Sequence, residues 1–245
     1  MAYEFEPINR EVYKKTFLKD VRLTAIFGDV DFACLDKDKL KSFFDTFQDS
    51  QVDLDNLPTG IRLFTADESV VLEYTLNRVM VQIRQKAYKS FENMMELLSV
   101  AKRYLQILGI SEVRSLSISK FNELKYNNSE GKYRLEDIMS IAFKNNLMQK
   151  IWSQDIEMKD LTRWEKSISM ADDESHSQFV IECGFQKKDA QNLSGSLTLK
   201  TLIESKAPVR IDDLADRATA YNQILDNAFH WCISDKIIQL MKGHE

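Results

Sequence analysis

The C-terminal stretch from Ile211 to Met241 reads IDDLADRATAYNQILDNAFHWCISDKIIQLM and decides how the chain is organised. Its apolar residues recur at spacings that alternate between three and four, the pattern of an amphipathic helix with one apolar stripe. The stripe comprises Ile211, Leu214, Ala218, Tyr221, Leu225, Ala228 and Cys232. The stripe is interrupted at Asp235, and the apolar residues after it lie on a side of the helix that is rotated from the stripe. The sequence therefore predicts one long helix over residues 211–241.

This helix would span about 46 Å at about 1.5 Å per residue, which exceeds what most small domains need. Two interpretations follow. The helix lies across a whole sheet of its own chain, or part of its apolar side meets a partner. The residues of that candidate interface are Ile211, Leu214, Ala218, Tyr221, Leu225, Phe229, Ile233 and Ile237.

The first half of the chain, residues 1–126, alternates strand and helix patterns. Strands are predicted near 21–27, 61–65, 70–83 and 113–124, and helices at 36–48 and 89–108. Asp36 stands at an N-cap position, and Gly109 supplies the stop after the second helix. Because the run 70–83 is long for a strand, we expect it to bulge or bend near Asn77 and Arg78. The order β-α-β-β-α-β predicts a ferredoxin-like half, with an antiparallel sheet and two helices on one face.

The second half, residues 127–245, predicts the order α-β-β-β-α. After a linker-like segment at 125–132 come a helix at 134–149 and strands near 161–170, 178–186 and 195–203. These strands continue the first sheet or form a second one. The fold class is therefore α+β with antiparallel sheets, in two halves or in one continuous domain.

Composition limits the function classes. The 245 residues carry a net charge of −5 with a pI of about 5.4, whereas dedicated nucleic-acid binders are usually basic. Three separated cysteines, Cys34, Cys183 and Cys232, predict reduced, mostly buried thiols rather than a disulfide framework. No apolar run approaches the roughly 18 residues that cross a bilayer, and the charged N-terminus is not a signal peptide. We expect a cytoplasmic protein without a membrane span.

No residue pattern points to catalysis, a cofactor or a metal. Asp226, His230 and Ser234 share one side of the last helix, but side chains stacked along one helix rarely reach triad geometry, so i,i+4 hydrogen bonds are expected instead. The acidic turn before His176 lacks the spacing of a calcium loop. Glycine-rich phosphate loops are missing. The sequence therefore favours a non-enzymatic protein and identifies no catalytic, cofactor-binding or metal-ligating residue; an enzyme with an unfamiliar site is a third interpretation.

Basic and aromatic residues of the first half support an alternative, which is RNA binding. Ferredoxin-like sheets can stack bases on exposed strand aromatics. The basic residues are Lys37, Lys39, Lys41, Arg84, Lys86, Lys89, Lys120, Lys125, Lys132 and Arg134, with Tyr88, Phe121, Tyr126 and Tyr133 among them. The same strands carry Glu73, Glu112 and Glu123, which disfavour phosphate binding.

Three blocks resemble one bacterial family: YKSFE at 88–92, LSISKFN at 116–122 and ILDNAFHWCISDK at 224–236, with the opening FEPIN at 5–9. They resemble the bacterial "sporadically distributed protein" family of about this length, whose motifs are Arg-Tyr-Ile-Asn in a strand and Phe-Glu-x-x-Ile-Thr in the last helix. This chain departs at Ser119, Lys120 and His230, which replace the Arg, Tyr and Glu. The resemblance implies an α+β fold and a bacterial cytoplasmic origin, but no activity.

The sequence thus leads to a hypothesis of function. It favours a non-enzymatic protein-interaction or accessory component of a bacterial system, with protein partners or a homodimer formed through the C-terminal helix. The alternative is an RNA-binding module that uses the ferredoxin-like half. Neither hypothesis involves a membrane.

Overall fold

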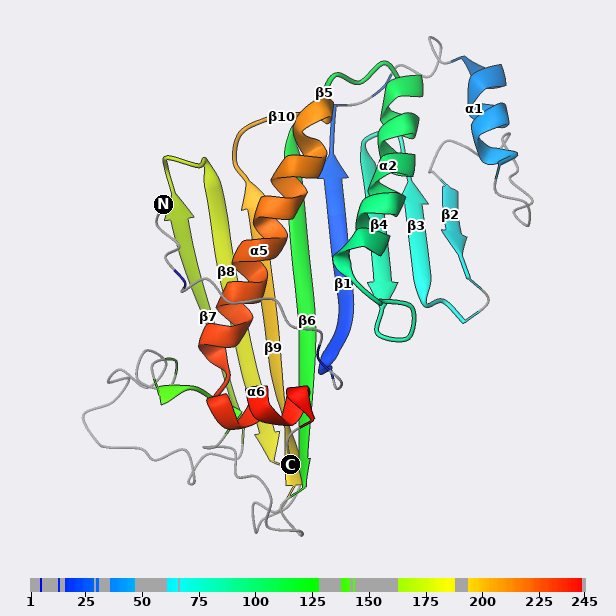
Figure 1. Cartoon of the computed structure of the whole chain (residues 1–245). Helices are drawn as coiled ribbons and strands as arrows, with labels where there is room; N and C mark the ends of the chain where they lie inside the picture. The colour runs from blue at the N-terminus through cyan, green and yellow to red at the C-terminus, as the bar shows by residue number, and fades with distance from the viewer. Residues whose placement is uncertain are drawn as a thin grey trace.

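One antiparallel sheet of eight strands organises the molecule (Figure 1). The computed structural model describes residues 5, 13, 16–28, 30, 36–46, 61–65, 67–127, 138–141, 143, 163–187 and 194–243. The strands are β1 (Leu18–Ile26), β2 (Ile61–Phe64), β3 (Val70–Tyr74), β4 (Arg78–Arg84), β6 (Ser115–Asn127), β7 (Arg163–Asp172), β8 (Ser177–Lys187) and β9 (Ser194–Ser205). They lie in the order β2-β3-β4-β1-β6-β9-β8-β7, which confirms the predicted α+β class with an antiparallel sheet.

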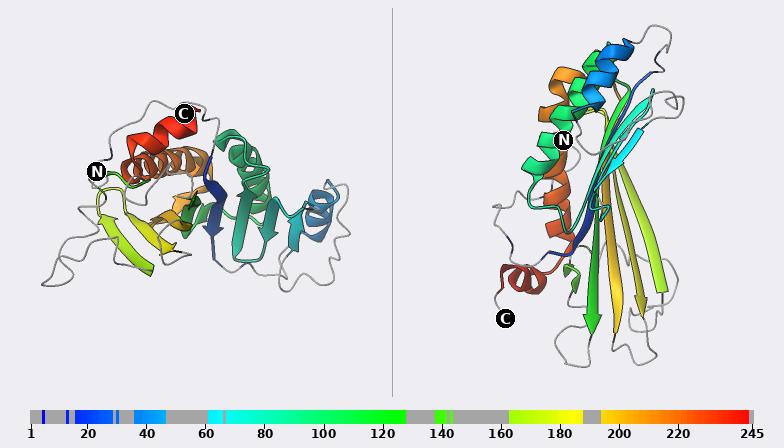
Figure 2. Two further views of the ribbon diagram at one scale, coloured as in Figure 1. Left: turned by 90° about the horizontal axis from the view of Figure 1, so that it is seen from below. Right: turned by 90° about the vertical axis from the view of Figure 1, so that its right-hand side faces the viewer.

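Helices cover one face of this sheet (Figure 2). They are α1 (Lys37–Phe44), α2 (Phe91–Ile107), α5 (Leu214–Cys232) and α6 (Asp235–Lys242). A separate two-stranded pair, β5 (Glu112–Val113) with β10 (Val209–Arg210), lies at the start of β6 and just before α5. No helix in the described part of the chain is long and apolar enough to cross a membrane.

Strand β6 joins the two halves of the chain, because it pairs with β1 on one side and with β9 on the other. Ile118 stands opposite both Leu23 and Ile203, and all three side chains are buried in the core. The second half therefore continues the first sheet. The strands β3, β4, β1 and β6 are neighbours, but β2 extends the sheet at one edge and β9 continues it at the other. The ferredoxin-like description of the first half stays a prediction.

The expected strand over 70–83 is wrong, because the chain reverses direction between β3 and β4. Thr75 closes the turn: its hydroxyl accepts a hydrogen bond from the backbone N–H of Arg78 at 2.9 Å and donates one to Asn77 Oδ1 at 2.9 Å. The buried residues on the helix-covered face stand at even positions in β3 and at odd positions in β4. This shift of the buried positions from even to odd numbers marks the reversal in the sequence. The surrounding apolar residues make the shift hard to recognise.

Both end signals of the early helices are confirmed. The carboxylate of Asp36 accepts a hydrogen bond from the backbone N–H of Lys39 at 3.0 Å, which satisfies an open amide of the first turn of α1. After α2, Gly109 adopts a φ of 71°, a left-handed conformation that glycine reaches without steric cost. The predicted helix over 134–149 falls mostly outside the described residues.

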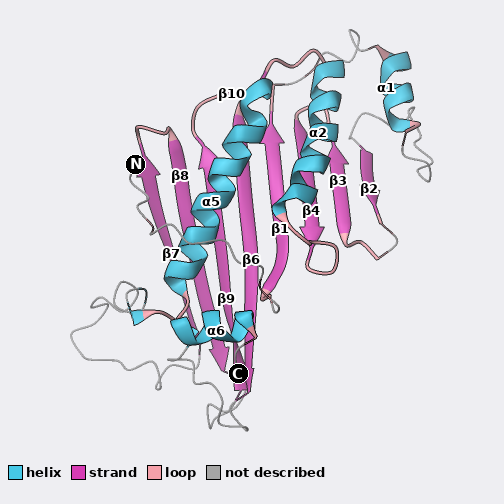
Figure 3. Cartoon of the chain, viewed as in Figure 1, coloured by secondary structure: helices cyan, strands magenta, loops and turns pink. Residues whose placement is uncertain are grey.

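A long C-terminal helix is confirmed, but its predicted single run over 211–241 is wrong. It is two helices, because α5 ends at Cys232 and α6 starts at Asp235 after an extended Ile233 (Figure 3). At this break the backbone pairs with a distant segment. The N–H of Ser140 donates to the carbonyl of Cys232 at 3.0 Å, and the N–H of Ser234 donates to the carbonyl of Ile138 at 2.9 Å. Those bonds replace the ones that a continuous helix would make.

The candidate interface of the C-terminal helix lies inside the chain's own core. All eight of its side chains are buried, from Leu225 at 0% to Ile211 at 9% exposure. Helix α5 packs on β6 and β9 through this stripe. The structure therefore supports the first interpretation, in which the helix crosses its own sheet. A partner could reach the stripe only if α5 left the sheet.

Truncating this stripe should destabilise the fold. We expect Leu225→Ala to lower the free energy of unfolding by about 2–5 kcal/mol, because the change removes buried methyl groups and leaves a cavity. The matched control is Thr219→Ala on the exposed side of the same helix, with an expected change within about 0.5 kcal/mol. Urea unfolding followed by circular dichroism measures both. Equal effects of the two substitutions would contradict the packing described.

Candidate functional site

The face of the sheet opposite the helices is the largest candidate surface, because no described element lies on it (Figure 2). We call it the uncovered face and define it by the outward-pointing residues of the eight strands. Strand β7 shows the alternation clearly. Its outward residues Arg163, Glu165, Ser167, Ser169 and Ala171 are exposed, and the residues between them on the other side are more buried wherever they are described.

One row of this face crosses all eight strands. The registers of the seven strand pairs place these residues side by side: Phe64, Val71, Gln82, Arg22, Ser119, Leu202, Val180 and Ser169. We call this the central row. Four of its eight residues are apolar: Phe64 is 59% exposed, Val180 and Leu202 are half-buried, and Val71 is fully buried. Ile26, on the same face of β1, is 41% exposed. The row is more apolar than a fully solvated sheet face requires.

Charge is divided unequally between the two halves of the uncovered face. The half formed by β2, β3, β4 and β1 has four outward arginines and two outward carboxylates: Arg22, Arg62, Arg78 and Arg84, with Asp20 and Glu73. The half formed by β6, β9, β8 and β7 has four carboxylates and three basic residues: Glu123, Glu165, Glu182 and Glu204, with Lys125, Arg163 and Lys200. We call these the arginine half and the carboxylate half.

A hollow of about 370 Å³ lies in the carboxylate half. Gly184 occupies an outward position between Glu165 and Thr198 and has no side chain to fill it. Phe121 lines the hollow together with an ion pair in which Lys200 Nζ lies 3.0 Å from Glu182 Oε2. This combination of a ring and an exposed ion pair suits one amphipathic side chain of a partner rather than a reacting substrate.

The covered face contains a buried ionic cluster. Lys120 of β6 points towards α5, is 5% exposed and forms an ion pair with Asp226. The amide of Asn222 donates to the other oxygen of this carboxylate at 3.1 Å. Because its ammonium group is enclosed between sheet and helix, Lys120 cannot serve the RNA hypothesis. Lys125, two outward positions beyond Phe121, is exposed on the uncovered face.

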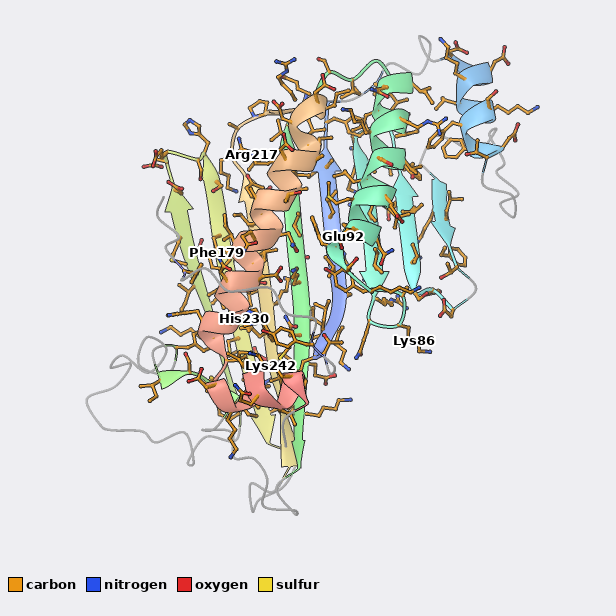
Figure 4. All side chains as sticks on the ribbon, viewed as in Figure 1. Lys86, Glu92, Phe179, Arg217, His230 and Lys242 are labelled. Carbon is orange, nitrogen blue, oxygen red and sulfur yellow. The ribbon has the colours of Figure 1, made fainter. Side chains whose placement is uncertain are left out.

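His230, labelled on α5 in Figure 4, links the cluster to the N-terminal part of the chain through Tyr13. Its Nδ1 lies 2.8 Å from the backbone carbonyl of Asp226, which can only accept, so Nδ1 carries the hydrogen. The neutral ring then accepts a hydrogen bond at Nε2 from the Tyr13 hydroxyl, and the two rings stack at 5.5 Å. Burial lowers the pKa of His230, opposed by the hydrogen bond to Asp226.

Phe5 lies against the same helix. Its ring centroid is 5.4 Å from that of Phe179 on β8 and 5.7 Å from that of Trp231 on α5. Phe5 and Tyr13 thus attach the N-terminal part of the chain to α5 at two points. Phe5 makes apolar contacts, whereas Tyr13 forms a hydrogen bond with His230. Only the Tyr13 contact therefore depends on the protonation of His230.

The remaining sequence candidates have structural roles. Of the i,i+4 hydrogen bonds expected between Asp226, His230 and Ser234, the one between His230 Nδ1 and the backbone carbonyl of Asp226 is present, whereas the backbone of Ser234 belongs to the helix break. Burial raises the pKa of the Cys183 thiol to about 12, so this thiol is a weak nucleophile. Cys232 is buried too, whereas Cys34 lies outside the described residues.

The acidic turn at Asp172 is closed by its own hydrogen bonds. The Asp172 carboxylate accepts from the Ser175 hydroxyl at 2.7 Å and from the backbone N–H of Glu174 at 3.2 Å. Within the described ranges, no group of three or more His, Cys, Asp or Glu side chains is placed to hold a metal ion. Tyr133, Lys132 and Arg134 of the RNA hypothesis fall outside those ranges.

Two of the three departures from the resembled family's motifs meet in the structure. Lys120 and His230 both contact Asp226, the first through an ion pair with its carboxylate and the second through its backbone carbonyl. Ser119, the third departure, lies in the central row on the opposite face. The sequence carried no signal that Lys120 and His230 are neighbours, because β6 and α5 are far apart along the chain.

Comparisons with known proteins add no family. No protein-family model matches the chain, and no curated protein matches it significantly. Among solved structures, one described as "KH domains" is 10% identical, over 95% of this chain and 75% of that chain, with a TM-score of 0.20. A TM-score this low does not establish a shared fold, so no argument rests on that likeness. The resemblance to the sporadically distributed family stays a prediction.

The His230 cluster predicts a pH dependence of stability. The folded state holds the pKa of His230 below its usual value of about 6.5, so the unfolded chain binds this proton more readily. The contribution of neutral, buried His230 to the free energy of unfolding is therefore complete above about pH 6.5. It is lost as the pH falls from there towards the pKa of His230 in the folded state. Urea unfolding at several pH values should show this loss in the wild type and less of it in His230→Gln.

The matched control is His176→Asn, in an exposed turn where the φ of 47° suits asparagine. It should keep the pH dependence of the wild type. If His230→Gln and the wild type lost stability equally between pH 7.5 and pH 5.5, the burial of a neutral His230 would be contradicted.

Proposed function

We propose that this chain is a non-enzymatic protein-interaction component that binds protein through the uncovered face of its sheet. The observation that carries the proposal is the central row. It brings exposed Phe64 and the half-buried Leu202 and Val180 into one line that crosses every strand. Apolar groups spread across a flat surface with a polar surround are typical of protein interfaces.

The mixed charge of the face favours a protein partner. Its arginines and lysines alternate with carboxylates in both halves, and several are paired, as in Lys200 with Glu182 and Arg163 with Glu165 at 2.6 Å. A nucleic-acid backbone presents only negative charge and would meet these carboxylates unfavourably. A protein surface can present both signs, so electrostatic complementarity is within its reach.

The surface differs from the one that the sequence favoured. The apolar stripe of α5 is already used against β6 and β9, so the proposal moves the contact from the C-terminal helix to the opposite face of the sheet. The role as an accessory component of a bacterial system, and its cytoplasmic location, rest on the sequence resemblance.

The test is capture followed by a binding measurement. Purified chain is immobilised, exposed to an extract of the cell that encodes it, and the retained protein is identified and purified. Phe64→Ser combined with Leu202→Ser should weaken binding of that protein at least about tenfold, because apolar residues near the centre of an interface carry much of its affinity. Calorimetry measures the affinity.

The matched control is Ile141→Ser, which also removes an exposed apolar side chain, 74% exposed, but lies outside the sheet. It should change the affinity less than about twofold. A partner that binds the face variant as tightly as the wild type would remove the uncovered face from the proposal. No retained protein at all would argue against an interaction role.

RNA binding is the second candidate, and the arginine half is the observation that favours it. The guanidinium of exposed Arg62 lies 5.9 Å from the centre of the Phe64 ring, an arrangement that could hold a phosphate beside a stacked base, and Arg22 is exposed three strands further along the central row. Fluorescence anisotropy with a short single-stranded RNA at about 50 mM salt tests it, because phosphate contacts are strongest at low salt. Under the protein-binding proposal we expect no binding. Salt-sensitive binding that is lost in Arg22→Glu would establish the RNA candidate instead.

A further inference from the structure

The hollow in the carboxylate half spans two neighbouring rows of the uncovered face. The strand registers place its outward residues side by side as Phe121, Lys200, Glu182 and Ser167 in one row and Thr198, Gly184 and Glu165 in the next. Gly184 is buried and forms the floor, because it lacks a side chain where its neighbours have one. The volume of about 370 Å³ is near the lower end of the roughly 300–1,000 Å³ of small-ligand sites.

Ion pairs keep the rim of the hollow neutral. Lys200 Nζ lies 3.0 Å from Oε2 of Glu182, and Arg163 Nη2 lies 2.6 Å from Oε1 of Glu165. Two acidic side chains at outward positions are thus balanced by two basic ones. A charged guest would have to compete with one of these pairs, whereas a neutral guest leaves both intact.

The pair of Lys200 with Glu182 offers a guest both a hydrogen-bond donor and an acceptor. The ion pair uses Oε2 of Glu182, and a carboxylate can accept at its other oxygen as well. The ammonium group of Lys200 carries three hydrogens, of which the ion pair takes one. A hydroxyl group matches both partners, because it can donate to the carboxylate and accept from the ammonium group.

Phe121 adds an aromatic wall to the hollow. Its side chain is half-buried and stands opposite Lys200 in the register of β6 and β9. A second ring that enters the hollow can pack on it, since aromatic pairs are stable at centroid distances of about 4.5–7 Å. The side chains of serine and threonine carry a hydroxyl but no ring. Tyrosine carries both, and it is enriched at protein interfaces.

From the ring, the neutral rim and the ion pair together, and resting on the proposed protein-binding function, we propose that this hollow receives a tyrosine side chain of the protein partner. The tyrosine ring packs against Phe121 and fills the space over Gly184. Its hydroxyl donates to Glu182 and accepts from Lys200. The uncovered face thus has one specific pocket in addition to the apolar groups of the central row.

The isolated tyrosine side chain, p-cresol, tests the site without the partner. Titration of the isotope-labelled full chain, followed by nuclear magnetic resonance, should shift the amide signals of Gly184, Thr198 and Lys200 saturably. We expect an affinity in the millimolar range, because so small a ligand has few atoms to contribute. Toluene lacks the hydroxyl and should bind at least about threefold more weakly. The tryptophan side chain, methylindole, can donate but not accept, and the same loss is expected for it.

Two variants alter the hollow itself. Gly184→Val fills it with a branched side chain that strands favour, and Gly184 is not among the glycines with a positive φ. Phe121→Ala removes the aromatic wall. Each should weaken p-cresol binding at least about fivefold. The matched control is Phe64→Ala, which removes an exposed ring from the same face outside the hollow and should change binding less than about twofold.

Circular dichroism and urea unfolding establish that each variant is folded, and Phe121→Ala decides if Gly184→Val does not fold. Without saturable shifts at the three amides the proposal is overturned. The same holds if p-cresol binds the folded variants as tightly as the wild type. Equal binding of p-cresol and toluene overturns the role of the hydroxyl, and tighter binding of methylindole replaces tyrosine by tryptophan.

Failure of this inference is distinguishable from failure of the proposed function. A captured partner that depends on Phe64 and Leu202, but binds Gly184→Val as tightly as the wild type, would keep the protein-binding function and overturn only the tyrosine site. Binding of p-cresol in the hollow by a chain that captures no protein would overturn the proposed function instead.

Discussion

Packing of α5 on β6 and β9 is the constraint on which the rest of the structure depends. The apolar stripe of this helix is buried against strands that come from the two halves of the chain. The position of α5 therefore requires these strands to belong to one continuous sheet. Within the same contact, Lys120 is held inside by Asp226. A buried cation without this carboxylate would be strongly unfavourable, so that the ion pair sets where α5 can lie along β6.

The same constraint decides which surface is left for other molecules. Helices α1, α2, α5 and α6 all lie on one face, so the outward residues of eight strands share the other. On that face, residues distant in sequence become neighbours through register alone. Phe64, Arg22 and Leu202 belong to three separate strands, yet they stand in one row. The proposed binding role is therefore a property of the sheet as a whole.

The end of α5 shows how a local pattern is overridden by a distant partner. The stripe rotates at Asp235 in the sequence, and in the structure the backbone at this point bonds to Ile138 and Ser140. His230, one turn earlier, is enclosed by Tyr13 from the N-terminal part of the chain. Both contacts gather segments from the two ends and the middle of the chain around the last turns of one helix.

Elements whose signals are local can be predicted from the sequence. The apolar alternation of β1, β8 and β9, the Asp36 cap and the Gly109 stop depend on residues within a few positions, and local sterics and hydrogen bonding decide them. The break at Ile233, the inward direction of Lys120 and the rows of the uncovered face follow only from tertiary contacts. Those features depend on which strands are neighbours and in what register. Strand pairing joins residues far apart in the chain, and no periodicity in a single sequence contains that information.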